Sequence, residues 1–276
     1  MPHSKTKPSI LLIGCGNMGS AMLQGWQKND VYTHCDIVDP SVNSTHVETK
    51  TTSCFPSINE VEKMHSDIVI FAVKPQIIDH VLTDYTQSTH QANMYISIAA
   101  GVTTTSLANH LGKEKKIIRC MPNTPASISA GVMAMYSSPS TNDEDKDAIN
   151  SLMSALGEVV WLAQEDDMHS ITALSGSGPA YVFHFIECLE QIALDQGLSK
   201  ENAKLISRQT VVGAALLAKV EYDIDIETLR QNVTSPGGTT EAGLKSLMSK
   251  DNQNLKTLLE KTINRAKERS VDLSEN

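Results

Sequence analysis

Two glycine-rich stretches carry the residue types with which a protein backbone holds anions. The first, "LLIGCGNMGSAML", sets Gly14, Gly16 and Gly19 in G-x-G-x-x-G spacing, between an apolar run and a segment of helical period. Gly14 permits a tight turn, Gly16 lets the backbone approach a pyrophosphate, and Gly19 lets the following helix pack closely. The N-terminal amides of that helix then face the anion, so the stretch predicts a dinucleotide site.

An acid follows 20 residues after Gly19, at the end of the short apolar run "DIVDP". At the tip of a second strand, Asp39 is placed to accept hydrogen bonds from ribose hydroxyls, which favours NADH. No lysine or arginine follows before Lys50, so a 2′-phosphate has no local partner. The alternative is that Asp39 only begins a turn with Pro40, a common role of aspartate.

The second stretch is "NVTSPGGTTEAGLKSLMSK", residues 232–250. Gly237 and Gly238 expose backbone amides just before a helix that we expect to begin near Thr239 or Thr240. Such a helix start is a seat for a substrate carboxylate, and the Thr240 hydroxyl beside it can hydrogen-bond a ring nitrogen. The alternative is an ordinary helix cap, which serine and threonine provide routinely.

The elements that must position these residues alternate in the first half of the chain. Fully apolar runs such as Ile68–Val73 are typical of strands covered on both faces, and segments such as Met18–Gln27 and Asp143–Leu156 have helical period. The pattern predicts an α/β Rossmann domain, with a doubly wound, mostly parallel sheet, over residues 1–165. The loops "AVKP" (72–75) and "SIAAG" (97–101) follow two of its strands and would face the cofactor.

Residues 166–276 are predicted to be all helical. A loop at Ser175–Gly178 leads into a helix that ends near Gly197, and a second helix follows Ser199. Both helices are too widely apolar for about 110 residues to bury, which indicates a homodimer through the C-terminal helices. The alternative is a compact single-chain bundle.

Composition narrows the classes of protein. The 276 residues carry a formal charge of −9, which argues against a nucleic-acid or anionic-membrane partner. No apolar run has the roughly 20 residues of a membrane helix, and the polar start has no leader pattern, so we expect a cytoplasmic protein. Five single cysteines indicate buried thiols in a reducing compartment, and His169 and His184 lack metal-ligand spacing, so no metal site is expected.

Six blocks in register, "GCGNMGSAM", "AVKPQ", "SIAAGV", "IRCMPNTPA", "SGSGPAY" and "VTSPGGTTEAGL", resemble the pyrroline-5-carboxylate reductase family. They cover residues 9–250, nearly the whole chain. The resemblance implies a Rossmann domain, then a helical dimerisation domain, with dimers that assemble further into decamers. The implied substrate is a small cyclic imine carboxylate, reduced to L-proline with NADPH or NADH.

The resemblance also implies roles for individual residues. Thr240 is implied as the catalytic hydroxyl on the ring nitrogen, and the substrate would be held by Asp223, Ser235, Gly238, Thr239 and Thr240. The dinucleotide would be held by Gly14, Cys15, Gly16, Asn17, Met18, Gly19, Asp39, Asn59, Ala72, Val73, Lys74, Pro75, Ser97, Ile98, Ala99 and Ala100. Many family members have Ser or Arg for a 2′-phosphate where this chain has Asp39 and Ser41.

Two other interpretations remain open at this point. One is another imine or hydroxy-acid dehydrogenase on the same architecture. The other is a non-catalytic dinucleotide sensor, although a sensor has no need for an anion seat such as residues 235–240. Hydride transfer to a protonated imine requires no strong base, which agrees with the absence of a recognisable catalytic His or Lys motif.

Overall fold

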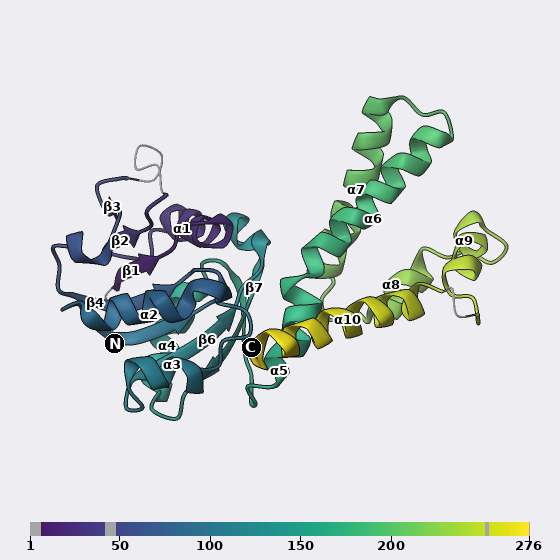
Figure 1. Ribbon diagram of the computed structural model, residues 1–276. Coiled ribbons are helices and arrows are strands. Elements are labelled where there is room, and N and C mark those ends of the chain that lie inside the picture. Colours follow the sequence, from purple (N-terminus) through teal and green to yellow (C-terminus); the bar gives the residue numbers. More distant parts are fainter. Residues whose placement is uncertain (1–6, 42–47, 252–253, 276) are drawn as a thin grey trace. The chain divides into compact units, whose positions relative to one another are not determined.

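The computed structural model describes residues 7–41, 48–251 and 254–275, so the polar N-terminal lead at 1–6 lies outside the described residues. The chain divides into two compact units (Figure 1). The first comprises Met1–Ser177 together with Ala266–Asn276, and the second comprises Gly178–Arg265. The predicted boundary between residues 165 and 166 is a division by function, and it stays a prediction.

Within the described residues, the first unit contains one eight-stranded sheet in the order β3-β2-β1-β4-β5-β6-β7-β8. All neighbouring strands pair in parallel except β6 and β7, which pair antiparallel. The strands are β1 (Ser9–Ile13), β2 (His34–Val38), β3 (Thr52–Phe55), β4 (His65–Phe71), β5 (Gln91–Ser97), β6 (Lys116–Met121), β7 (Gly131–Ser137) and β8 (Gly157–Trp161).

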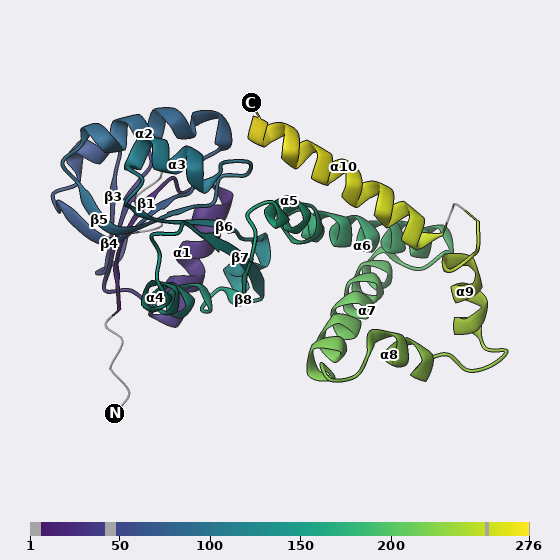
Figure 2. The same ribbon diagram turned by 90° about the horizontal axis from the view of Figure 1, so that it is seen from below.

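Helices cover both faces of this sheet, as Figure 2 shows. Leu12 and Ile70 face one side, where they pack with Trp26 and Leu152, whereas Leu11 faces the other side. Because successive strand side chains point to opposite faces, strands covered on both sides are apolar throughout. The helices on the first side are α1 (Asn17–Asn29) and α4 (Asp143–Met153), and those on the second are α2 (Ile78–Gln87) and α3 (Thr104–Leu111). The predicted doubly wound, mostly parallel fold is therefore confirmed.

Two local elements differ from expectation. β3 carries no long apolar run and was not predicted, because as an edge strand it has only one buried residue, Thr52. The expected loop at Ser175–Gly178 is partly helical: α5 (Asp167–Ile171) continues into a π-helical turn, Thr172–Gly176. The Ser177 amide donates to the Thr172 carbonyl at 2.9 Å, five residues back, which absorbs the glycine-rich sequence without breaking the helix.

The second unit is helical in its described residues. Its elements are α6 (Gly178–Asp195), α7 (Lys200–Val220), α8 (Ile226–Asn232), α9 (Thr239–Leu247) and the start of α10 (Leu255–Glu275). α6 packs on α7, yet large side chains such as Phe183, Leu205 and Leu216 remain 56–63% exposed. Apolar surface of this extent marks an interaction surface. In the described part of the chain, no helix has the length and apolarity to cross a membrane.

The first unit also buries a polar group, His90, which is 5% exposed. Its Nδ1–H donates to the Lys63 carbonyl at 2.8 Å, and its Nε2 lies 3.2 Å from the Ser66 hydroxyl, so the neutral ring is satisfied. Burial lowers the pKa of His90 from the ordinary value of 6.5, and the Lys63 hydrogen bond opposes this shift only in part. The fold therefore disfavours the protonated ring.

This burial predicts a pH dependence of stability. A histidine with a depressed folded pKa takes up its proton first in the unfolded chain, so stability is full above pH 6.5 and falls as the pH drops below it. We expect His90→Gln to reduce the loss of unfolding free energy between pH 7 and pH 5. The measurement is urea denaturation at both values, with exposed His80→Gln as the control. Equal losses in both variants would contradict the assignment.

Candidate dinucleotide site

The turn between β1 and α1 is built by close backbone approach. Gly14 has φ +94°, and a Cβ at this position would lie 2.6 Å from the Ala72 carbonyl oxygen. A Cβ on Gly19 would collide with the Gly14 carbonyl oxygen. Only glycine meets both demands, and the result places the start of α1 directly beyond the ends of β1 and β4.

The first amides of α1 are left for a ligand. Gly16 is the N-cap residue and has no side chain with which to cap them, and the space where its Cβ would stand is open to 4 Å. No acidic side chain lies in the first turn of the helix. The unsatisfied N–H groups and the positive end of the helix dipole therefore suit a pyrophosphate.

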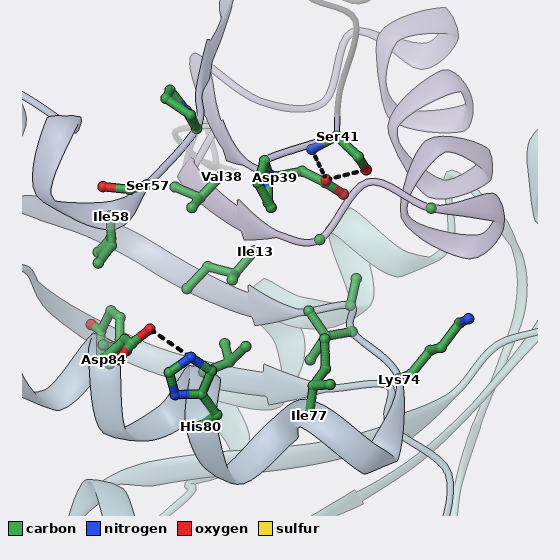
Figure 3. Close-up of a pocket in the computed structure, with 18 of the residues that line it drawn as sticks. Ile13, Val38, Asp39, Ser41, Ser57, Ile58, Lys74, Ile77, His80 and Asp84 are labelled. Atoms are coloured by element: carbon green, nitrogen blue, oxygen red, sulfur yellow. Dashed lines mark hydrogen bonds and ion pairs between the residues drawn. The ribbon is translucent and has the colours of Figure 1, made fainter.

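A cavity of about 920 Å³ opens beside this turn, at the carboxyl ends of the strands (Figure 3). Seven of the residues expected to hold the dinucleotide line it: Gly14, Gly16, Asp39, Asn59, Ala72, Val73 and Lys74. Other lining residues were not foreseen, among them Ser57, Ile58, Ile77 and His80. Ser57 and Ile58 lie in the connection after β3, whereas Ile77 and His80 follow the AVKP loop, in a 3-10 turn and in α2. None of the four stands in a motif, so only the fold reveals them.

The remaining expected cofactor residues are placed differently. Cys15, Asn17, Met18 and Gly19 belong to the turn and to α1 but do not line the cavity, and Pro75 begins a short 3-10 turn after Lys74. The residues at the end of β5 do not line the cavity either; they are Ser97, Ile98, Ala99 and Ala100. These assignments stay predictions.

Asp39 holds the glycine turn and also faces the cavity. Its Oδ2 accepts the Cys15 amide at 2.7 Å. Its Oδ1 accepts the Ser41 amide at 2.9 Å and the Ser41 hydroxyl at 2.7 Å, as Figure 3 shows. Burial raises the pKa of Asp39, but the three hydrogen bonds outweigh burial and hold it below its ordinary value. The carboxylate is therefore charged at neutral pH. Burial and this charge together raise the pKa of the Cys15 thiol, which stays protonated.

The elbow at residues 235–240 lies in the second unit. Gly237 has φ +71° and Gly238 is the N-cap of α9, so the predicted helix start at Thr239 is observed. The Gly238 amide donates to the Ser235 carbonyl at 3.0 Å, and the Gly237 amide donates to Glu241 Oε2 at 2.6 Å. Thr239 and Thr240 are exposed at the helix start, as is Asp223 in the turn after α7.

A doubly wound sheet with a glycine turn, an uncapped helix start and an acid at the end of β2 defines a dinucleotide-binding protein of the Rossmann class. Residues 9–101 match a family model described as NADP oxidoreductase, coenzyme F420-dependent. Residues 165–273 match one described as pyrroline-5-carboxylate reductase dimerisation, which supports the predicted homodimer.

Similarity to individual proteins extends over nearly the whole chain. The pyrroline-5-carboxylate reductase of Pasteurella multocida is 36% identical, with 96% of this chain and 97% of that protein covered. The structure of the Coxiella burnetii enzyme is 36% identical, with a TM-score of 0.86 and coverage of 98% and 100%. The Plasmodium falciparum enzyme with NADP bound is 31% identical, with a TM-score of 0.83 and coverage of 98% and 99%. The chain belongs to the pyrroline-5-carboxylate reductase family.

The open space at Gly16 allows cofactor binding to be tested by a substitution that leaves the stability of the fold unchanged. We expect Gly16→Ala to keep the melting temperature within about 2 °C, because the added methyl meets no neighbour. The methyl would stand where the backbone approaches the pyrophosphate, so NAD(P)H affinity should fall about tenfold or more. Titration of nicotinamide fluorescence measures this affinity, with Gly178→Ala, also in open space, as the control. Unchanged affinity in Gly16→Ala would place the pyrophosphate elsewhere.

Proposed function

We propose that this chain reduces 1-pyrroline-5-carboxylate to L-proline, the last step of proline biosynthesis, with NADPH or NADH. The observation that carries the proposal is family membership over nearly the whole chain. The glycine turn and the elbow, the two features that the reaction needs, are both intact. When bound, the dinucleotide supplies the hydride that reduces the imine carbon.

The first unit would bind and orient the dinucleotide. Gly14, Gly16 and the amides at the start of α1 hold the pyrophosphate, and the charged Asp39 accepts hydrogen bonds from the adenine ribose. Cys15, Asn17, Met18 and Gly19 complete the turn. Asn59, Ala72, Val73 and Lys74 form the wall, with Pro75 directly after them, and Ser97–Ala100 lie at the nicotinamide end. The small side chains at 99 and 100 let the nicotinamide ring approach the backbone.

The elbow would bind the substrate carboxylate through the first turn of α9. The amides of Gly237 and Gly238 are already engaged by Glu241 and Ser235, so the donors left for the carboxylate are those of Thr239 and Thr240. The hydroxyls of Ser235 and Thr239 add further donors, and Gly238 allows the close approach. Asp223 is assigned to the edge of the substrate.

Thr240 is the residue to which we assign a direct role in the reaction. Its hydroxyl hydrogen-bonds the ring nitrogen, which orients the ring and stabilises the protonated imine, the form in which the neighbouring carbon is electrophilic. The reduction requires no strong base from the protein. The contribution of the chain is chiefly orientation, which is worth as much as ~7–11 kcal/mol in favourable cases.

We further assign residues 1–165 to cofactor binding and residues 166–276 to dimerisation and substrate binding. The match to the dimerisation family from residue 165 supports this division. Dimers assemble into decamers, and the protein acts in the cytoplasm. The decamer is implied by the family resemblance, whereas the cytoplasmic location is predicted from the pattern of apolar residues.

The activity is tested by the loss of nicotinamide absorbance when the protein meets pyrroline-5-carboxylate. The wild type should turn over, and Thr240→Val should lower kcat about tenfold or more, roughly 1.4 kcal/mol, with cofactor affinity unchanged. Thr240→Ser, which keeps the hydroxyl, should retain most of the rate. A wild type that binds cofactor without turnover would exclude the reductase function, and an unaltered kcat in Thr240→Val would remove Thr240 from the mechanism.

Asp39 predicts a preference for NADH. A 2′-phosphate beside its carboxylate brings two negative charges together, and Lys74 is the only lysine or arginine among the described residues that line the cavity. Asp39→Ser should raise the ratio of kcat/KM for NADPH to that for NADH about tenfold. Both cofactors share the glycine turn, so loosening of the turn cancels in this ratio. Asp84→Ser, at another acid of the same cavity, is the control, and an equal shift there would contradict the assignment.

A further inference from the structure

The loop at residues 98–102 joins the end of β5 to the start of α3. Ala99 and Gly101 in it are buried, although the segment is short and has no side chain larger than isoleucine. In the function proposed above, its first residues lie at the nicotinamide end, and the present inference rests on that proposal. The position of this loop would then set the geometry of hydride transfer.

One carboxylate ties down the far end of the loop. Glu165, in the connection between β8 and α5, accepts the Thr104 amide on Oε1 at 2.8 Å and the Thr104 hydroxyl on Oε2 at 2.7 Å. Thr104 is the first residue of α3, so the negative charge also lies at the positive end of the helix dipole. The contact spans 61 residues of sequence.

The same carboxylate reaches the other end of the loop through Arg119. Glu165 Oε1 accepts Nη1 of Arg119 at 3.2 Å, and Arg119 is the register partner of Ser97, the last residue of β5. Arg119 is 1% exposed, and its Nε and Nη2 have no partner within the described residues. Glu165 therefore binds groups at both ends of the loop.

The last turns of α10 close the loop from another side. Gly101 has φ +81°, and a Cβ there would lie 2.6 Å from the Leu273 carbonyl oxygen, so helix and loop are in backbone contact. One turn earlier, the buried Ser270 hydroxyl lies 3.0 Å from Nδ1 of His169 on α5. These contacts leave the loop little room to move.

Stability alone does not account for this arrangement. A buried guanidinium with one ionic partner and two unpaired donor groups costs free energy that a well-packed apolar side chain would not. Such a pair is better suited to fixing one geometry of the groups that it joins.

We propose that Glu165 is a positioning residue. Through its bonds to Thr104 and Arg119, Glu165 holds loop 98–102 in the position that hydride transfer requires, and the last turns of α10 pack against the same loop.

The test compares variants in the full-length protein. Glu165→Gln is the direct change, but it leaves the buried Arg119 without a charged partner, which can prevent folding. Thr104→Val is therefore the deciding variant, because it removes the hydroxyl bond to Glu165 Oε2 and keeps the backbone amide bond to Oε1, with little change in side-chain volume. The matched control is Thr103→Ala: Thr103 caps the same helix by accepting the Ser106 amide at 3.1 Å, whereas the side-chain hydrogen bonds of Glu165 go to Thr104 and Arg119. Each protein is assayed for melting temperature, NAD(P)H affinity and single-turnover reduction of pyrroline-5-carboxylate.

We expect Thr104→Val to lower the single-turnover rate about fivefold to tenfold, with dinucleotide affinity within about twofold. Thr103→Ala should lower the melting temperature by a similar amount, because it removes a helix cap, and should leave the single-turnover rate unchanged. Rates that fall in proportion to melting temperature in both variants would show a merely structural role and overturn the proposal, as would an unchanged rate in Thr104→Val. A wild type without turnover would instead remove the reductase function itself, together with this role of Glu165.

Discussion

The architecture of the first unit depends on the close contact of backbone with backbone at the end of β1. Gly14 stands against the Ala72 carbonyl, and Gly19 stands against the Gly14 carbonyl, so the ends of β1 and β4 and the start of α1 are in direct backbone contact. Any Cβ at either position would push the helix start away from the strand ends. The cavity beside the turn, the uncapped amides of α1 and the position of Asp39 all depend on this backbone contact.

Asp39 joins the geometry of the turn to the choice of ligand. Its hydrogen bond to the Cys15 amide fixes the middle of the glycine turn, and its charge faces the place where the ribose is expected. A substitution that admits a 2′-phosphate therefore also removes a support of the turn. On the proposed assignment of Asp39 to the ribose, one substitution therefore changes both the cofactor preference and the rigidity of the turn.

Local patterns predicted a large part of the fold. The glycine turn, the apolar strands and the start of α9 were all foreseen, because each is encoded within a few neighbouring residues. β3 was missed because an edge strand needs no long apolar run, and the π-helical turn was missed because glycines and serines usually indicate a loop.

Of the candidate site, sequence foresaw the residues that stand in motifs. It did not foresee the walls of the cavity, such as Ser57 and Ile77, or the contacts of Glu165 with Thr104 and Arg119. Those contacts join residues 61 and 46 positions apart, and only the packing of the sheet brings them together. The roles of the substrate residues rest on the family resemblance.

The second unit has a consequence for how the chain is made. Among its described residues only Ala203 and Ser207 are buried, whereas many large apolar side chains of α6 and α7 are exposed. Such a unit draws its stability from association, and that stability rises with the concentration of chains by mass action. A newly synthesised copy, alone and dilute, exposes surface that favours aggregation until a second copy is found. Expression level is thus a determinant of folding yield for this protein as well as of its amount.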